Sequence, residues 1–147
     1  VRDENTKLRF HIAGRNAPEW LERSIRRKGI IYHGEIDDAE DYILKANIVI
    51  IPIFSGSGIR VRAIQAMAMG VPVITGSRGI EGIEASHGTH LMIANTADEF
   101  TDCILRLNED EELYRKISIN SRKFVARNYN NEKIAEGLRS FYLSHLQ

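Results

Sequence analysis

The fold is decided by residues 49–75, which read VIIPIFSGSGIRVRAIQAMAMGVPVIT. The continuous apolar run at residues 48–52 predicts a parallel strand that is covered on both faces. A loop of small residues, 55–58, comes next, and its backbone amides can approach a ligand closely because little side chain stands in the way. Residues 59–69 carry Ala and Met on most faces, which predicts a buried helix. Gly70 ends this helix and a second apolar run follows, so the stretch predicts a strand–loop–helix–strand unit.

The start of the predicted helix has the features of an anion site. Its unpaired backbone amides and the positive end of its dipole directly follow the glycine loop. Arg62 and Gln65 are three residues apart and therefore share one face of the helix. A guanidinium can bind a phosphate, and a side-chain amide can hydrogen-bond a sugar hydroxyl. The alternative, that Arg60 and Arg62 only form the solvated side of a half-buried helix, stays open on these residues alone.

The loop does not match the common nucleotide-binding fingerprints. Gly56-Ser57-Gly58 lacks the third glycine of the dinucleotide motif, and no Gly-Lys-Ser/Thr sequence follows as it does in a P-loop. Both of those classes of site are therefore excluded.

Residues 55–75, followed by Gly-Ile-Glu-Gly-Ile at 79–83, resemble the signature of retaining glycosyltransferases with the two-domain GT-B fold. More narrowly, they resemble the carboxy-terminal, donor-binding half of the group 1 (family 4-like) enzymes. The resemblance covers the chain from about Leu8 to its end. It implies that a sugar is transferred, with retention of configuration, from a nucleotide-diphosphate sugar to an unknown acceptor. It implies no cofactor and no metal, since the nucleotide sugar is itself the substrate.

The resemblance also assigns roles to residues. The positions that it implies for the donor diphosphate are Gly56, Ser57, Gly58, Ile59, Arg60 and Arg62. Gln65 occupies the position at which the family carries a Glu that binds the nucleotide ribose. Further contacts to the base or the sugar are expected from Gly14, Gly34, Glu35, Ile36 and Glu81. No catalytic residue is assigned.

Two positions depart from the family's motif. Gln65 stands where a carboxylate is usual, and an amide cannot accept hydrogen bonds from both hydroxyls of a diol as a carboxylate does. Ser57 stands where many members carry an earlier Glu near the sugar, although a Gly-Ser-Gly variant is itself familiar in the family. These departures support a second hypothesis, a catalytically inactive Rossmann-like domain for nucleotide binding or interaction. A third, a flavodoxin- or receiver-like module, is disfavoured because it does not explain the glycine loop.

Strand and helix patterns alternate along the rest of the chain. Strands are predicted at residues 7–13, 30–33 and 91–94, and helices at 18–28 and 39–45. The first helix is expected to turn Trp20, Leu21 and Ile25 inward, and Asp37 or Asp38 is expected to cap the second. This α/β alternation predicts a Rossmann-like parallel sheet flanked by helices, with ligands beyond the carboxyl ends of the strands.

The last third of the chain, residues 97–147, predicts C-terminal helices. The apolar positions of the first of them are Phe100, Cys103, Ile104 and Leu107. Asp110 is expected to cap the next helix. The positions that mark the terminal helix are Ile134, Leu138, Phe141 and Tyr142.

The composition excludes several classes of protein. Lys and Arg number 20, as do Asp and Glu, so no broad electrostatic footprint for nucleic acid is present. The single Cys103 cannot form an internal disulfide and fits a reducing compartment, so a cytoplasmic location is expected. No signal peptide or membrane-spanning run is found. His87 and His90 lack metal-ligand partners at useful spacing, while His11 and His33 lie in or at the end of strands and are interpreted as structural.

Compared with the family, residues 1–147 are expected to be a truncated nucleotide-sugar-binding domain. The family's opening strand, which is central in its sheet, and its amino-terminal acceptor domain are not found in this sequence. About five strands are expected, in a sheet that either closes the gap or exposes an edge. An exposed edge can pair with a second copy, so a homo-oligomer is one expected arrangement. The fragment alone is expected to be inactive, and peripheral membrane association of the parent stays open.

Overall fold

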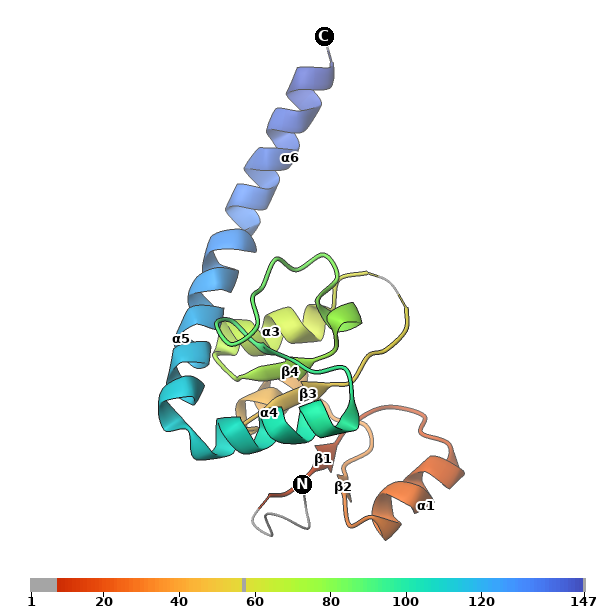
Figure 1. Cartoon of the computed structure of the whole chain (residues 1–147). Helices are drawn as coiled ribbons and strands as arrows, with labels where there is room; N and C mark the ends of the chain where they lie inside the picture. The colour runs from red at the N-terminus through yellow and green to blue at the C-terminus, as the bar shows by residue number, and fades with distance from the viewer. Residues whose placement is uncertain (1–7, 57, 147) are drawn as a thin grey trace. The chain divides into compact units, whose positions relative to one another are not determined.

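The computed structural model describes residues 8–56 and 58–146 (Figure 1). The chain divides into two compact units, with the division between Lys45 and Ala46. Ser57, which the family resemblance assigned to the donor diphosphate, lies outside the described residues.

The first unit contains two short parallel strands and two helices. In chain order these are β1 (His11–Ile12), α1 (Glu19–Arg27), β2 (Ile31–Tyr32) and α2 (Ala39–Leu44). The register places His11 opposite Ile31 and Ile12 opposite Tyr32. All four elements fall within the residues for which the sequence predicted them.

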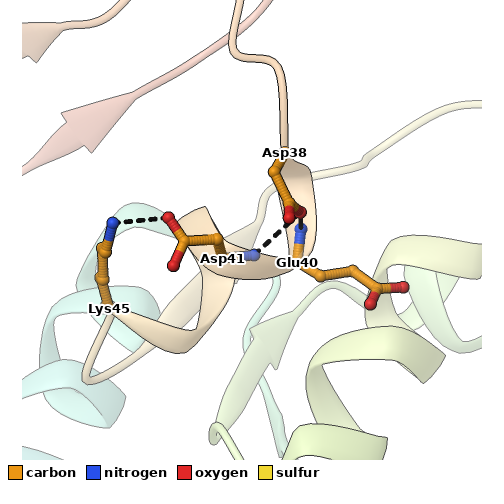
Figure 2. A network of polar contacts seen from close by, with 4 residues as sticks. All are labelled: Asp38, Glu40, Asp41 and Lys45. Atoms are coloured by element: carbon orange, nitrogen blue, oxygen red, sulfur yellow. Dashed lines mark hydrogen bonds and ion pairs between the residues drawn. The ribbon is translucent and has the colours of Figure 1, made fainter.

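Helix α2 begins at a side-chain cap that the sequence indicated. Asp38, rather than Asp37, is the N-cap residue, and its Oδ1 accepts hydrogen bonds from the backbone amides of Glu40 (2.8 Å) and Asp41 (3.0 Å). The Lys45 ammonium pairs with the Asp41 carboxylate one turn later (Figure 2). A carboxylate at this position accepts hydrogen bonds from backbone amides that have no partner inside the helix. The cap therefore sets the residue at which α2 begins.

The second unit is a three-stranded parallel sheet with helices on its sides. In chain order its elements are β3 (Val49–Ile51), α3 (Val61–Met69), β4 (Val73–Thr75), the 3₁₀-helix η1 (Ser77–Ile80), β5 (Met92–Ile93), α4 (Ala97–Glu109), α5 (Glu111–Asn128) and α6 (Asn131–His145). The strand order is β3-β4-β5, with Val49 opposite Val73 and Ile74 opposite Met92. In Figure 1, α3 lies on one side of β4 and α4 lies on the other. This is the parallel, helix-flanked arrangement that the sequence predicted.

The core of the second unit is centred on β4, because that strand has a neighbour on each edge and a helix on each side. Val73, Ile74 and Thr75 are all inaccessible to solvent. The buried residues of the surrounding helices include Ala63, Ala66, Met67, Phe100, Cys103, Ile104, Leu107 and Ile117. The four apolar positions predicted for the helix after residue 97 are therefore confirmed. Asp110 caps α5, as predicted, by accepting a hydrogen bond from the amide of Leu113 at 2.9 Å.

The five described strands form two hydrogen-bonded sheets, β1-β2 and β3-β4-β5. The sequence analysis expected about five strands in one sheet. Each unit thus has a hydrogen-bonded sheet of its own among the described residues.

Three local expectations need correction. Helix α3 begins at Val61, two residues later than expected, because Arg60 is its N-cap with an extended backbone. The segment after Thr75 contains η1, a tight helix, although no helix was predicted between Thr75 and the strand at 91–94. Trp20 is 66% exposed, whereas Ile25 on the same helix is buried. Trp20 lies one position off the Leu21–Ile25 line, and one residue is about 100° of rotation around a helix.

The apolar residues of α6 are exposed rather than packed. Ile134, Leu138, Phe141 and Tyr142 each have more than half of their surface accessible. None of the helices within residues 8–56 and 58–146 combines the length and the apolar character that crossing a membrane requires.

Candidate functional site

The loop between β3 and α3 is shaped by its glycines. Gly56 and Gly58 have φ angles of +96° and +94°, in the region that residues with a side chain avoid. These two glycines turn the chain from the carboxyl end of β3 to the start of α3. The backbone there is open to an approaching ligand, because neither glycine presents a side chain.

The start of α3 lacks the capping side chain or first-turn acid that each of the other described α-helices carries. The N-caps of α2, α4, α5 and α6 all have side chains that accept hydrogen bonds from helix amides. Helix α1 has no such side chain, but it carries Glu19 and Glu22 in its first turn. Helix α3 has neither a side-chain cap nor an acid in its first turn, and it carries Arg60 and Arg62 instead. Its positive end is therefore not neutralised from within the helix, which favours an external anion.

Arg60 folds back over the glycine loop. A Cβ added at Gly56 would lie 3.1 Å from Nη2 of Arg60, so the guanidinium rests against the loop backbone. Its Nε is buried and has no hydrogen-bond partner among the described residues. A buried guanidinium N–H without an acceptor is costly, so a ligand oxygen that reached it would be bound favourably.

Arg62 and Gln65 lie together on α3, as their spacing predicted. Nη1 of Arg62 donates a hydrogen bond to Oε1 of Gln65 at 2.9 Å. Gln65 is half-buried, and Arg62 is exposed. Since its oxygen already accepts from Arg62, the amide of Gln65 offers mainly its NH₂ group to a ligand.

The loop that contains Glu81 packs against the start of α3. A Cβ added at Gly82 would lie 3.0 Å from Cγ1 of Ile59, so these two segments are in close contact. Glu81 itself forms an exposed ion pair with Arg78, at 3.7 Å. The structure therefore brings Glu81's loop to the glycine loop, although the carboxylate is held by an arginine of its own segment.

The carboxyl edge of the β3-β4-β5 sheet is fixed by groups that the sequence analysis did not single out. Thr75 is fully buried, and its hydroxyl donates to the carbonyl of Ile51 at 2.8 Å. Oδ1 of Asn95 accepts a hydrogen bond from the amide of Ser77 at 2.9 Å. Asn95 directly follows the last predicted strand. Its position at a strand end could have marked it as a candidate site residue, because ligands bind at the carboxyl ends of parallel strands. These contacts hold η1 and the start of the Glu81 loop at the sheet edge.

The first unit joins its own group of predicted site residues. The amide of Gly14 donates to the carbonyl of Gly34 at 2.8 Å, and the hydroxyl of Tyr32 donates to the carbonyl of Gly14 at 3.0 Å. Arg15 and Glu35 form an exposed ion pair at 2.7 Å. Gly14, Gly34 and Glu35 are thus close together, and Ile36 follows them half-buried. The Gly34 backbone has φ +69°, which favours glycine at this turn.

A hollow of about 270 Å³ opens near the Glu81 loop, lined by Gly82, Glu84, Phe124, Asn128 and Tyr129. Burial raises the pKa of the Tyr129 hydroxyl above its ordinary value, and the negative charge of Glu84 adds to this effect. The hydroxyl donates to the carbonyl of Gly82 at 3.4 Å, which is a long hydrogen bond. The sequence analysis did not predict this hollow, because its lining comes from two distant segments. In the part of the chain that the structure describes, no group of three or more His, Cys, Asp or Glu side chains could hold a metal ion.

The comparisons with known proteins identify the family. Residues 1–110 match the family model described as glycosyl transferases group 1. Because the match covers most of the chain, this chain belongs to the group 1 glycosyltransferase family. A Klebsiella pneumoniae relative, described as an "uncharacterized 44.6 kDa protein in cps region", is 27% identical over 143 residues, which are 91% of this chain and 37% of the relative.

Solved structures of glycosyltransferases have the same fold. Anabaena Alr3699/HepE in complex with UDP superposes with a TM-score of 0.77 at 19% identity, over 90% of this chain and 41% of that one. A point mutant of S. aureus TarM, in complex with fondaparinux, alpha-GlcNAc-glycerol and UDP, has a TM-score of 0.79 at 18% identity, over 95% and 30%. Sucrose-phosphate synthase from Thermosynechococcus elongatus has a TM-score of 0.74 at 24% identity, over 91% and 37%. The chain spans less than half the length of each of these proteins.

These matches confirm the predicted family and the predicted fold, a GT-B glycosyltransferase half with a parallel sheet flanked by helices.

Proposed function

We propose that this chain is the donor-binding part of a glycosyltransferase that transfers a sugar, with retention of configuration, from a nucleotide-diphosphate sugar. Residues 1–147 would form a nucleotide-sugar-binding domain, with 97–147 as its C-terminal helices. The acceptor would be held by an amino-terminal domain of the parent enzyme, since donor and acceptor must be positioned together for transfer. The observation that carries the proposal is the buried, unpartnered Nε of Arg60 beside the glycine loop, in a chain of this family.

The diphosphate would lie at the glycine loop and the start of α3. Gly56, Gly58 and Ile59 come directly before a helix start that has no acid of its own, so their backbone amides would donate to the diphosphate. Arg60, whose Nε has no partner in the described chain, would turn its guanidinium to donate to a phosphate oxygen, and Arg62 would add a second positive charge. Negative charge builds up on the nucleotide diphosphate as the sugar leaves, so the same groups would stabilise the transition state more than the bound donor.

Gln65 would bind the ribose. Its Oε1 accepts from Arg62, so its NH₂ group would donate to a ribose hydroxyl oxygen. Gln65 would thus donate one hydrogen bond to the ribose, whereas a carboxylate would accept two hydrogen bonds from the two hydroxyls of the diol. Arg62 would thus hold both the phosphate and the side chain next to the ribose.

The remaining assignments stay predictions. Base or sugar contacts are expected from Gly14, Gly34, Glu35, Ile36 and Glu81. The two arginines and the helix dipole would supply positive charge to the diphosphate, and this scheme includes no cofactor and no metal. A cytoplasmic location, pairing with a second copy through a sheet edge, and peripheral membrane association of the parent belong to the same set of predictions.

A second candidate is a catalytically inactive nucleotide-binding or interaction domain. It is favoured by Gln65, whose amide replaces the usual carboxylate and whose oxygen is already engaged by Arg62. As a nucleotide-binding domain this candidate also predicts UDP binding, and as an interaction domain it predicts none; only the first candidate predicts sugar transfer by the full-length parent.

The experiment is a calorimetric titration of the chain with UDP, in parallel with Arg60→Gln and Arg115→Gln variants. Charge-assisted hydrogen bonds contribute about 1.5–3 kcal/mol, so Arg60→Gln is expected to weaken UDP binding by about 10- to 100-fold. Arg115 on α5 is the matched control, because its guanidinium is engaged by Glu111 at 2.6 Å. Its replacement should leave UDP binding unchanged.

Equal weakening by both replacements, or binding that is insensitive to Arg60, would contradict the proposed phosphate contact. Turnover by the full-length parent then separates the two candidates, since an inactive domain would bind UDP without transferring sugar.

A further inference from the structure

The hollow beside the Glu81 loop is lined by residues that the proposed donor site does not use. Gly82 and Glu84 line it from the segment that follows η1, and Phe124, Asn128 and Tyr129 line it from the end of α5. Its volume is about 270 Å³, just below the range of about 300–1,000 Å³ in which drug-sized ligands bind. The hollow therefore suits a smaller molecule.

The two sides of the hollow are held in place by packed neighbours. Ile83 on one side and Val125 on the other are both buried. The ring of His90 lies against that of Phe124, with centroids 4.7 Å apart, and Nδ1 of His90 accepts from the amide of Ser86 at 3.0 Å. The loop of the first side is thus fixed to α5 by contacts within the second unit.

Three hydrogen-bond acceptors line the hollow. Glu84 is exposed, and its carboxylate forms no ion pair with any side chain that the structure describes. Asn128 donates from Nδ2 to the carbonyl of Phe124 at 2.9 Å, which leaves its Oδ1 as an acceptor. The carbonyl of Gly82 accepts the long 3.4 Å hydrogen bond from the Tyr129 hydroxyl and has a second lone pair for a ligand.

Two aromatic rings add faces that attract positive charge. The ring centroids of Phe124 and Tyr129 are 6.1 Å apart, and the ring planes are inclined by 55°. One cation can therefore lie within about 6 Å of both centroids, which is the distance at which aromatic faces attract a cation. Burial and, in second place, the charge of Glu84 raise the pKa of the Tyr129 hydroxyl, so the carboxylate acts on the same part of the hollow. None of the five lining residues is basic.

We propose that this hollow binds the ammonium group of a small alkylamine. A primary ammonium group has three N–H donors and no acceptor, which matches the three acceptors of Gly82, Glu84 and Asn128 in number and in kind. Its positive charge and its alkyl chain would lie against the rings of Phe124 and Tyr129. An anion would instead be repelled by the carboxylate, and a neutral molecule would lack the attraction to the carboxylate and to the rings. The site does not rest on the proposed donor function, because none of its residues is assigned to the donor.

The test is an amide-resolved NMR titration of the chain with n-butylammonium chloride. The neutral ligand of similar size is n-butanol, and sodium chloride is the control for ionic strength. We expect saturable shifts at residues 82–84 and 124–129 with n-butylammonium, and no saturation over the same concentrations with n-butanol or sodium chloride. Equal binding of n-butanol and n-butylammonium, or saturable shifts that leave these residues unaffected, would overturn the proposal.

Three variants separate the contributions. Glu84→Gln keeps the shape of an exposed side chain and removes its charge, so it should weaken n-butylammonium binding by about fivefold. Phe124→Leu removes one ring and should weaken binding by about two- to fivefold. Glu136→Gln removes an exposed carboxylate on α6 and is the matched control, so it should leave binding unchanged. Equal affinity of wild type and Glu84→Gln, or equal weakening by Glu84→Gln and Glu136→Gln, would contradict the site.

Discussion

The Gly79→Ala substitution is expected to destabilise the second unit through a single contact. A Cβ added at Gly79 would lie 1.9 Å from Oγ1 of Thr75 and 3.1 Å from its Cβ. Thr75 is fully buried at the end of β4, so it cannot move outward, and its hydroxyl donates to the carbonyl of Ile51. The hydroxyl must therefore rotate away, and the carbonyl of Ile51 loses its donor. Gly79 does not have a positive φ, so the effect is steric and not a matter of backbone conformation.

The magnitude follows from two contributions. Overpacking a core costs about 1–3 kcal/mol, and loss of a buried hydrogen bond costs about 0.5–1.5 kcal/mol. Alanine reduces the entropy of the unfolded chain relative to glycine, which offsets about 0.4–1 kcal/mol of this. A net loss of about 2–3 kcal/mol in the free energy of unfolding is therefore expected. For a chain of this size that corresponds to a fall of about 4–12 °C in Tm.

Urea denaturation of four proteins measures this prediction: wild type, Gly79→Ala, Thr75→Ala and the double variant. Thr75→Ala removes Oγ1, so Gly79→Ala should cost less than about 1 kcal/mol in that background, and the two substitutions should be strongly non-additive. A Gly79→Ala variant within about 0.5 kcal/mol of wild type would refute the reasoning, as would equal costs in both backgrounds.

Three further substitutions test other contacts, each by urea denaturation. Asp110→Ala removes the acceptor for the amide of Leu113 and should lower the free energy of unfolding by about 1 kcal/mol. Asp110→Asn keeps a side-chain oxygen and should retain most of the stabilisation by the cap. Equal stability of the two variants would contradict the capping role. Gly70→Ala places a side chain at φ +78° and should cost about 1–2 kcal/mol, so an unchanged stability would argue against the left-handed turn. The Tyr114 hydroxyl donates to the carbonyl of Asn47 at 3.0 Å, and burial raises its pKa above the ordinary value of about 10. Because folding raises the pKa of the hydroxyl, the protonated Tyr114 stabilises the folded chain in full below about pH 10. This stabilisation is lost as the pH rises through the folded-state pKa. Tyr114→Phe should therefore be less stable than wild type at pH 7 by about 1 kcal/mol and should lose less stability above pH 10; parallel pH profiles would contradict this.

Strong local patterns predicted much of the fold. The spacing of Phe100, Cys103, Ile104 and Leu107 fixes one buried stripe on α4, and all four are buried. Asp110 could be assigned as a cap because its short side chain carries an oxygen acceptor and directly precedes a segment with acidic residues and helical apolar spacing. Such an oxygen accepts hydrogen bonds from the backbone amides that have no partner inside the helix.

Features that depend on distant segments could not be predicted in the same way. The separation of the strands into two sheets depends on which backbones meet, and residue patterns do not encode that. The apolar positions of α6 have helical spacing, but Ile134 and Phe141 remain exposed, because periodicity shows that a face is apolar and not that a partner covers it.

The candidate site was predictable to a similar degree. The contact between Arg62 and Gln65 follows from their spacing on one helix. The position of Arg60 over Gly56 does not, because it depends on a loop whose glycines adopt positive φ angles. The hydrogen bond from Ser77 to Asn95 joins two segments across the sheet edge, which only the folded chain brings together.

The central claim is that the start of α3 binds the diphosphate of a nucleotide donor. An amide-resolved NMR titration of the chain with UDP, GDP and ADP tests it most directly. The account predicts saturable shifts at Gly56, Gly58 and residues 59–65 with at least one nucleotide, and weaker binding of the same nucleotide after Arg60→Gln. Unchanged spectra with all three nucleotides, or shifts that leave these residues unaffected, would contradict it.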